Sequence, residues 1–284
     1  MGPGLIGGSE MFKFPKTEPE ITITDLPDDR FEVLCRDDQS GFVLLEPGED
    51  VEFAFYDYPP DAPDRHPELV EGSPEPVEGH PEVVEGPLVF TGAHRLRVGN
   101  RIMIEGVEAL ETDWWYAEAG SDYADRSGTT YNVLNDKGHR IAGWIQRYDP
   151  EKWAYERYEM TPLPALLRPG LKASGHERVI VGDEVIRESE ISYEVVGAAR
   201  VMVGPKAYRC LKVMNSYANA QGRESLAEYY VSDTGRTIYF RRYDGPASSR
   251  YSERLKDKPT LEYNGVTWRH FYNCLPDHAL IVGW

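Results

Sequence analysis

Short segments in which apolar and polar residues alternate, separated by turn sequences, recur along most of this chain. In the segment 236–243, Ile238 and Phe240 share one face of an extended chain, which predicts a strand with one buried face. Asn264 and Gly265, between two such segments, form the pair most typical of a two-residue hairpin turn. Roughly a dozen segments at a spacing of about 8–12 residues predict an antiparallel all-β fold, either a β-sandwich or a strongly curved half-barrel.

The same pattern divides the chain into regions. Residues 161–172 contain three Pro and predict a crossing segment rather than a helix. We therefore expect a disordered N-terminus at residues 1–20, an N-terminal β region at 21–160 and a C-terminal β region at 161–284. The two β regions form either one domain or two β subdomains. Few short helices are expected, and the best candidate is 248–256.

Residues 66–86 are three tandem heptads, HPELVEG, SPEPVEG and HPEVVEG. Each heptad carries a Pro and a Gly, and Pro removes a backbone donor and clashes with the preceding helical turn, so a coiled coil is excluded. Six Glu without any Lys or Arg predict an extended, solvated acidic loop over residues 59–87. Because hairpin tips tolerate insertions, we expect 51–58 and 88–90 to be neighbouring strands.

The repeat resembles the translated product of short palindromic DNA repeats that spread through some bacterial genomes. This resemblance implies an inserted loop without a role of its own. Two functional alternatives stay open. One is a Pro/Glu-rich tract that binds a partner, and the other is a weak metal site that uses His66 and His80.

Charge and composition limit the function classes. The formal net charge of −17 argues against a nucleic-acid-binding protein, which needs a basic face, and against docking on anionic membranes. The three Cys at 35, 210 and 274 form no paired motif, so buried thiols in a reducing compartment are expected. Neither a secretory signal nor a membrane-spanning apolar run is seen, which predicts a cytoplasmic protein without membrane insertion. We expect no cofactor, and a homo-oligomer is compatible with the sequence.

Motifs for catalysis are scarce. The chain lacks a P-loop, a dinucleotide-binding Gly motif, a nucleophile elbow and a metalloprotease His pair. Reactive residue types gather only at Cys274, His270, Asp277 and His278. A thiol with a base and an orienting acid could act as a nucleophile, which leaves an enzyme of unknown class as an alternative. A metal site built from the same residues is not expected.

Aromatic side chains on alternating strands suggest a ligand-binding surface. Tyr and Trp are abundant, and together they could line a concave sheet face, although core packing accounts for the same residues. An arginine among them could hold an anionic group. The candidate ligand-binding residues are Trp114, Trp115, Trp144, Tyr193, Tyr230, Tyr239, Trp268 and Arg241.

Residues 160–284 resemble a group of uncharacterised bacterial β-rich proteins. The resemblance is carried by Val201, Val203, Tyr208, Cys210, Val213, Tyr229, Tyr230, Val231 and Gly235. In pattern these proteins are similar to lipoprotein-carrier half-barrels, in which a curved sheet cups an apolar ligand.

The sequence thus predicts a non-catalytic module that holds an apolar or aromatic small molecule, or a partner chain, on a concave sheet face. An enzyme using residues 270–278 is one alternative. A structural or assembly subunit, in which edge strands pair between copies, is the other.

Overall fold

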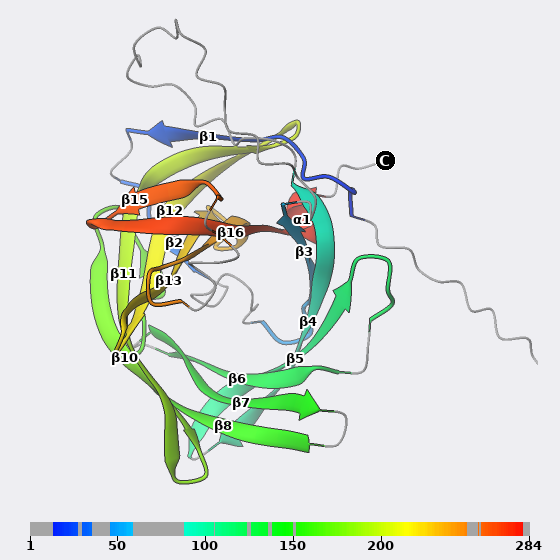
Figure 1. Cartoon of the computed structure of the whole chain (residues 1–284), viewed down its shortest axis with the longest axis vertical. Coiled ribbons are helices and arrows are strands. Elements are labelled where there is room, and N and C mark those ends of the chain that lie inside the picture. The colour runs from blue at the N-terminus through cyan, green and yellow to red at the C-terminus, as the bar shows by residue number, and fades with distance from the viewer. Residues whose placement is uncertain are drawn as a thin grey trace, which may run out of the picture.

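The computed structural model describes residues 14–27, 30–35, 46–58, 88–104, 106–123, 126–135, 138–149, 152–248, 255 and 257–280. Twelve of its strands form a closed antiparallel β-barrel, whose ring is seen end-on in Figure 1. The all-β prediction is confirmed. The β-sandwich and the half-barrel are both wrong, because strand β11 pairs with β10 on one side and with β12 on the other, which leaves the ring without a gap. The predicted loop 59–87, with His66 and His80, lies outside the described residues.

The ring consists of two consecutive arcs. The first arc contains β3 (Asp50–Asp57), β4 (Val89–Ile104), β5 (Val107–Glu118), β6 (Gly128–Asn135), β7 (Gly138–Asp149) and β8 (Lys152–Met160). The second contains β10 (Lys172–Val181), β11 (Glu184–Val203), β12 (Lys206–Asn219), β13 (Gly222–Ser232), β14 (Thr237–Asp244) and β16 (Val266–Pro276). The arcs meet where β8 pairs with β10 and where β3 pairs with β16. The predicted boundary at residues 160/161 falls between the arcs, and the existence of two subdomains stays a prediction.

Several short elements lie beside the ring. They are β1 (Ile21–Leu26), β2 (Val33–Leu34), β9 (Leu166–Leu167), β15 (Thr260–Tyr263) and α1 (Asp277–Leu280). β1 pairs with the C-terminal half of β11, and β15 pairs with β16. The β15–β16 turn has positive φ angles at Asn264 (51°) and Gly265 (72°), so the predicted hairpin is confirmed. β3 also pairs with β4 through Tyr56 and Phe90, as expected for strands flanking an insertion.

Two buried apolar clusters lie on opposite faces of the barrel wall. The inner cluster joins side chains from both arcs, such as Leu96 on β4 and Val213 on β12. The outer cluster contains Tyr230 and Leu275, together with Phe14 from the N-terminal segment. Tyr229 belongs to the inner cluster although it precedes Tyr230, as the alternation of a strand requires. Strands β13 and β14 of the second arc are therefore buried on both faces over most of their length.

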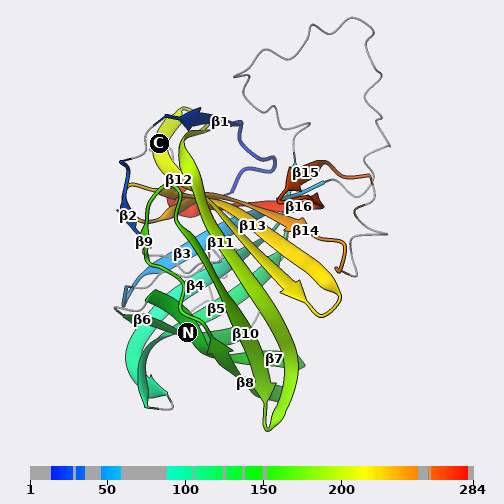
Figure 2. The same ribbon diagram turned by 90° about the vertical axis from the view of Figure 1, so that its left-hand side faces the viewer.

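The short strands β2 and β9 pair with each other and contribute to the inner cluster. Val33 lies opposite Leu167, and both side chains are buried there, as are Phe31, Cys35 and Leu163. Figure 2 shows the two strands at one end of the barrel. They fill the interior beside the second arc.

Residues 14–20, which we call the N-terminal strap, lie against the outside of the wall. The Glu18 amide donates to the Leu88 carbonyl (2.8 Å), and the Phe90 amide donates to the Lys16 carbonyl (2.9 Å). The Phe14 ring packs 5.8 Å from the Phe90 ring. The strap thereby covers the outer face near the junction of the two arcs.

Candidate functional site

A continuous series of aromatic rings follows the inner face of the barrel, and we call it the inner aromatic row. Its members are Tyr158, Trp144, Trp114, His94, Phe55, Tyr272, Phe240 and Tyr229. Their neighbouring ring centroids lie between 4.6 and 6.5 Å apart. The row therefore crosses both arcs, from β8 to β13.

The inner position of the row follows from pairing and packing. Tyr229 and Phe240 belong to the inner cluster, and Trp114, Phe55 and Tyr272 pack against it. His94 lies opposite Phe53, another member of that cluster, so its ring points to the same face. Trp144 reaches the row through its edge-to-face contact with Trp114, at 5.6 Å and 67°.

A glycine makes room for the contact between the two tryptophans. Gly128 on β6 lies opposite Trp114, and a Cβ at this position would stand 2.5 Å from the Trp114 indole nitrogen. Any larger residue would displace the ring, since cores resist added volume. The absence of a side chain at Gly128 thus lets the indole of β5 reach the indole of β7 across β6.

Burial changes along the row. Tyr229 and Phe240, on the second arc, are at most 1% exposed, whereas Trp114, Trp144 and His94, on the first arc, keep part of their surface accessible. The nearby Tyr116, whose ring contacts His94, is 39% exposed. The first arc therefore presents partly accessible aromatic rings toward the interior.

His94 is a neutral member of this surface. Burial lowers the pKa of its imidazole to about 4, so the ring carries no charge at neutral pH. Phe55 packs edge-on against it at 4.6 Å. Next to the row, the Asn132 amide donates to Thr130 Oγ1 (3.2 Å). This part of the wall is aromatic and polar without a positive charge among these groups.

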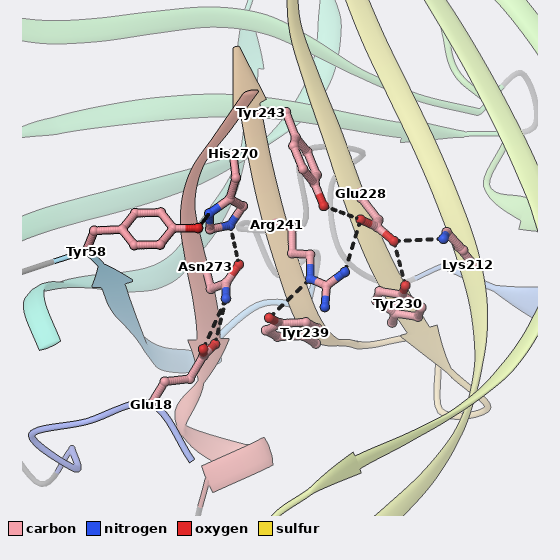
Figure 3. Close-up of polar contacts among 10 residues, drawn as sticks. All are labelled: Glu18, Tyr58, Lys212, Glu228, Tyr230, Tyr239, Arg241, Tyr243, His270 and Asn273. Atoms are coloured by element: carbon pink, nitrogen blue, oxygen red, sulfur yellow. Dashed lines mark hydrogen bonds and ion pairs between the residues drawn. The ribbon is translucent and has the colours of Figure 1, made fainter. Parts of the chain in front are cut away.

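A second assembly, which we call the outer polar cluster, lies on the same face as Tyr230 and Tyr239 of the outer apolar cluster, and its contacts are drawn in Figure 3. Its members are Glu18, Tyr58, Lys212, Glu228, Tyr230, Tyr239, Arg241, Tyr243, His270 and Asn273. They come from the strap, from the residue following β3, and from β12, β13, β14 and β16. The cluster thus connects six separate segments of the chain.

Glu228 is the charged centre of the outer polar cluster. Its side chain is 1% exposed, and it accepts hydrogen bonds from Tyr230 (2.6 Å) and Tyr243 (2.8 Å). Lys212 Nζ lies 2.9 Å from one carboxylate oxygen and Arg241 Nη1 3.7 Å from the other. Burial alone would raise the pKa of Glu228, but the two cations and the hydroxyl donors lower it to about 2. The carboxylate is therefore ionised and fully paired.

A chain of hydrogen bonds runs from Tyr58 to the strap. The Asn273 amide donates to both Glu18 carboxyl oxygens, at 2.9 and 3.1 Å, so its carbonyl oxygen faces His270. His270 Nε2 must then donate to that oxygen (2.7 Å), and Nδ1 accepts from Tyr58 (2.9 Å). Burial lowers the pKa of His270 to about 4, which keeps the ring neutral.

Glu18 is the least ordinary acid of the cluster. Burial raises the pKa of its carboxyl group to about 7, against the opposing effects of the Asn273 hydrogen bond and the Arg241 charge. The strap thus docks through a carboxyl group whose charge changes near neutral pH. The hydrogen bonds and ion pairs of the cluster join the strap to the wall strands.

The structure divides the predicted ligand-binding residues between the two faces. Trp114, Trp144 and Tyr193 lie on the inner face, where Tyr193 is buried in the inner cluster. Tyr230, Tyr239 and Arg241 belong to the outer polar cluster. Trp268 packs in a small outer cluster with Met214. The Arg97 guanidinium carbon lies over the Trp115 ring, 6.0 Å from the ring centroid. The eight residues therefore do not form one site.

The predicted catalytic residues are likewise separated. Cys274 lies in the inner cluster, whereas His270 belongs to the outer polar cluster. Burial raises the pKa of the Cys274 thiol well above its ordinary value, which disfavours a thiolate. His278 Nε2 donates to the Thr237 carbonyl (3.1 Å), and its Nδ1 lies 3.8 Å from Asp277. In the described ranges, no three His, Cys, Asp or Glu residues gather so as to hold a metal ion.

Sequence reasoning missed several members of both assemblies. His94, Phe55 and Tyr158 were not among the predicted residues, and neither were Glu18 and Glu228. A signal existed for Glu228, since it stands alone among apolar residues in the segment LAEYYV. For Glu18 there was none, because its partners lie more than 200 residues away.

Comparisons with known proteins give little further guidance. No protein-family model matches the chain, and no curated protein matches it. One similar solved structure is that of a Bacteroides fragilis protein described as exported and as having a YmcC-like fold. It shares 12% identity at a TM-score of 0.38, and the alignment covers 82% of this chain and 95% of that one. A likeness this low carries neither fold nor function to the present chain.

The expected cytoplasmic location is corrected by the same comparison. The neighbour is described as exported, and the cytoplasmic expectation is not kept. The expectation had rested only on missing sequence signals. Within the described residues, no helix combines the length and the apolar character needed to cross a bilayer.

Proposed function

We propose that this protein binds a flat, apolar small molecule inside the barrel, against the first-arc part of the inner aromatic row. The observation that carries the proposal is the pair of touching indoles, Trp114 and Trp144, whose rings stay partly accessible on the inner face. Accessible aromatic rings that converge on one another are the usual lining of a small-molecule site. The proposed activity is binding without chemistry.

The width of the barrel supports this proposal. A barrel of about eight strands encloses an interior that side chains alone can fill or that holds one small ligand. The diameter of a barrel grows with the number of its strands. This barrel has twelve strands, so more than wall side chains is needed to fill it. Beside the second arc, Phe31, Val33 and Leu167 from the β2–β9 pair contribute that filling. The indole pair belongs to the first arc.

The ligand class agrees with what the resemblance to half-barrel carriers implies, although the closed ring replaces the open sheet. The alternative enzymatic role of Cys274 gains no support from the geometry, since the thiol and His270 lie on opposite faces.

The neutral fluorescent probe N-phenyl-1-naphthylamine tests the proposal. The wild-type protein should enhance its emission on saturable binding. Trp144→Ala and Trp114→Ala should each weaken the affinity by about tenfold or more, because each removes a stacking partner worth about 1.4 kcal/mol.

Trp115→Ala is the matched control, since Trp115 follows Trp114 in the chain but points to the outer face. Its affinity for the probe should stay within about twofold of the wild type. Absence of saturable binding, or equal losses in Trp114→Ala and Trp115→Ala, would contradict the proposal. Far-ultraviolet circular dichroism of each variant shows that the barrel is intact.

A further inference from the structure

The indole nitrogens of Trp114 and Trp144 are buried, and neither has a hydrogen-bond acceptor among the described residues. An indole N–H is a donor only, and a buried donor without an acceptor costs free energy. The two rings touch at 5.6 Å, so two unsatisfied donors stand within one short stretch of the inner face. A bound molecule with hydrogen-bond acceptors could satisfy both N–H groups, which the described residues of the wall do not.

Trp268 shows that this fold can satisfy a buried indole by itself. Its ring is 1% exposed on the outer face, and its N–H donates to the Tyr263 carbonyl at 3.2 Å. The unsatisfied donors are thus a property of the inner indole pair and not of buried tryptophans in general. The two indoles that lack an acceptor are the ones on the surface to which we assign the ligand.

The charges near the pair restrict the kind of acceptor. Glu156, which is 6% exposed, pairs with Trp144 across β7 and β8, and it accepts a hydrogen bond from Tyr158 (3.2 Å). Arg187 lies over the Tyr158 ring but forms an ion pair with Glu177 at 2.9 Å. His94 is uncharged at neutral pH. Because Arg187 is already paired with Glu177, it offers an anionic ligand little compensation at low dielectric.

We infer that the ligand carries neutral hydrogen-bond acceptors, such as ketone oxygens or aromatic ring nitrogens, that accept from the indole N–H groups of Trp114 and Trp144. This inference rests on the proposed function and narrows it to one chemical class. Flat aromatic ketones and nitrogen heterocycles fit the pair, because their rings stack on the row while an in-plane lone pair reaches a ring-edge donor.

Three naphthalene probes that differ in one substituent test the inference. Naphthalene has no acceptor, 2-acetylnaphthalene has a neutral carbonyl, and 2-naphthoate is an anion. By isothermal titration or tryptophan quenching, 2-acetylnaphthalene should bind about tenfold more tightly than naphthalene, and 2-naphthoate more weakly than 2-acetylnaphthalene.

Substitution by Phe separates the donor from the ring. In Trp114→Phe and Trp144→Phe the aromatic surface remains, so naphthalene should bind within about threefold of the wild type, while the preference for 2-acetylnaphthalene falls to about threefold or less. Trp115→Phe should keep the full preference. If one inner variant fails to fold, as judged by circular dichroism, the other carries the test.

The possible failures are distinct. An unchanged preference for 2-acetylnaphthalene in both inner variants, equal binding of naphthalene and 2-acetylnaphthalene, or tightest binding of 2-naphthoate would overturn the inference and leave the proposed function standing. If none of the three probes binds, the proposed function falls, and the inference falls with it.

Discussion

At the scale of single residues, Glu228 shows how this fold accommodates a charge inside its wall. The carboxylate is 1% exposed and is paired with Lys212 and Arg241 while two Tyr hydroxyls donate to it. Removing Arg241 leaves the buried carboxylate with Lys212 as its single cation among these partners, and a buried charge that loses a partner is strongly destabilised.

We therefore expect Arg241→Met to lower the free energy of unfolding by about 3–5 kcal/mol in urea denaturation. The control is Arg101→Met, because Arg101 pairs with Glu108 on the surface, where both side chains are more than half exposed. That variant should lose less than about 1 kcal/mol. Similar losses in the two variants would show that the outer polar cluster is not buried as described.

Gly128 provides a second residue-scale prediction. Gly128→Ala would bring a Cβ to 2.5 Å from the Trp114 indole, so the ring must move, at a cost of about 1–3 kcal/mol. The tryptophan emission should change with it. Gly197→Ala is the control, since a Cβ there meets no atom within 4 Å. A fully stable Gly128→Ala protein with unchanged emission would contradict the contact between the two indoles.

At the scale of elements, the N-terminal strap is held by a group that titrates near neutral pH. The pKa of Glu18 is raised by burial from 4.5 to about 7. Above pH 4.5 the carboxyl group is ionised in the unfolded chain but still protonated in the docked strap. The stabilisation from this group is therefore complete below pH 4.5 and declines until pH 7, by up to about 3 kcal/mol.

Histidines oppose this trend, because burial lowers the pKa values of His94, His270 and His278 to about 4. The contribution of these neutral histidines to the free energy of unfolding is complete above pH 6.5 and is lost as the pH falls toward 4. The difference in unfolding free energy between wild type and Glu18→Gln removes these shared terms. We expect that difference to change in favour of Glu18→Gln by about 2–3 kcal/mol between pH 4.5 and 7.5.

Hydrogen exchange of residues 14–20 checks where the effect resides. In the wild type their protection should decrease over the same pH interval after correction for the intrinsic rate, and in Glu18→Gln it should not. A constant free-energy difference across the interval would show that Glu18 titrates normally and that the strap is fastened otherwise.

Elements defined by local signals could be predicted from the sequence. The Asn264–Gly265 turn and the pairing of 51–58 with 88–90 depend on nearby residues, and both are confirmed. The strap could not be predicted, since Glu18 and Asn273 are joined only by the closed ring. Tyr229 and Tyr230 are adjacent in β13 and therefore point to opposite faces, but nothing in the sequence indicated that both faces are buried.

At the scale of the whole molecule, closure decides what the aromatic residues do. The same alternation of apolar and polar residues is compatible with a sandwich, a half-barrel and a barrel. These folds differ in whether the edge strands of the sheet pair with each other. Here the sheet closes because β11 pairs with both β10 and β12. Without the ring, the eight predicted ligand-binding residues looked like one set. With it, Trp114 and Trp144 lie inside, and Trp115 and Trp268 lie outside.

The most direct measurement uses this division. The chain has six Trp, and each indole N–H gives its own signal in a nitrogen-15 correlation spectrum, assigned by single substitutions. On titration with 2-acetylnaphthalene, the signals of Trp114 and Trp144 should shift in a saturable manner, while those of Trp115 and Trp268 stay in place. Shifts confined to Trp115 or Trp268, or no saturable shift at all, would contradict the account of an inner, ligand-binding aromatic wall.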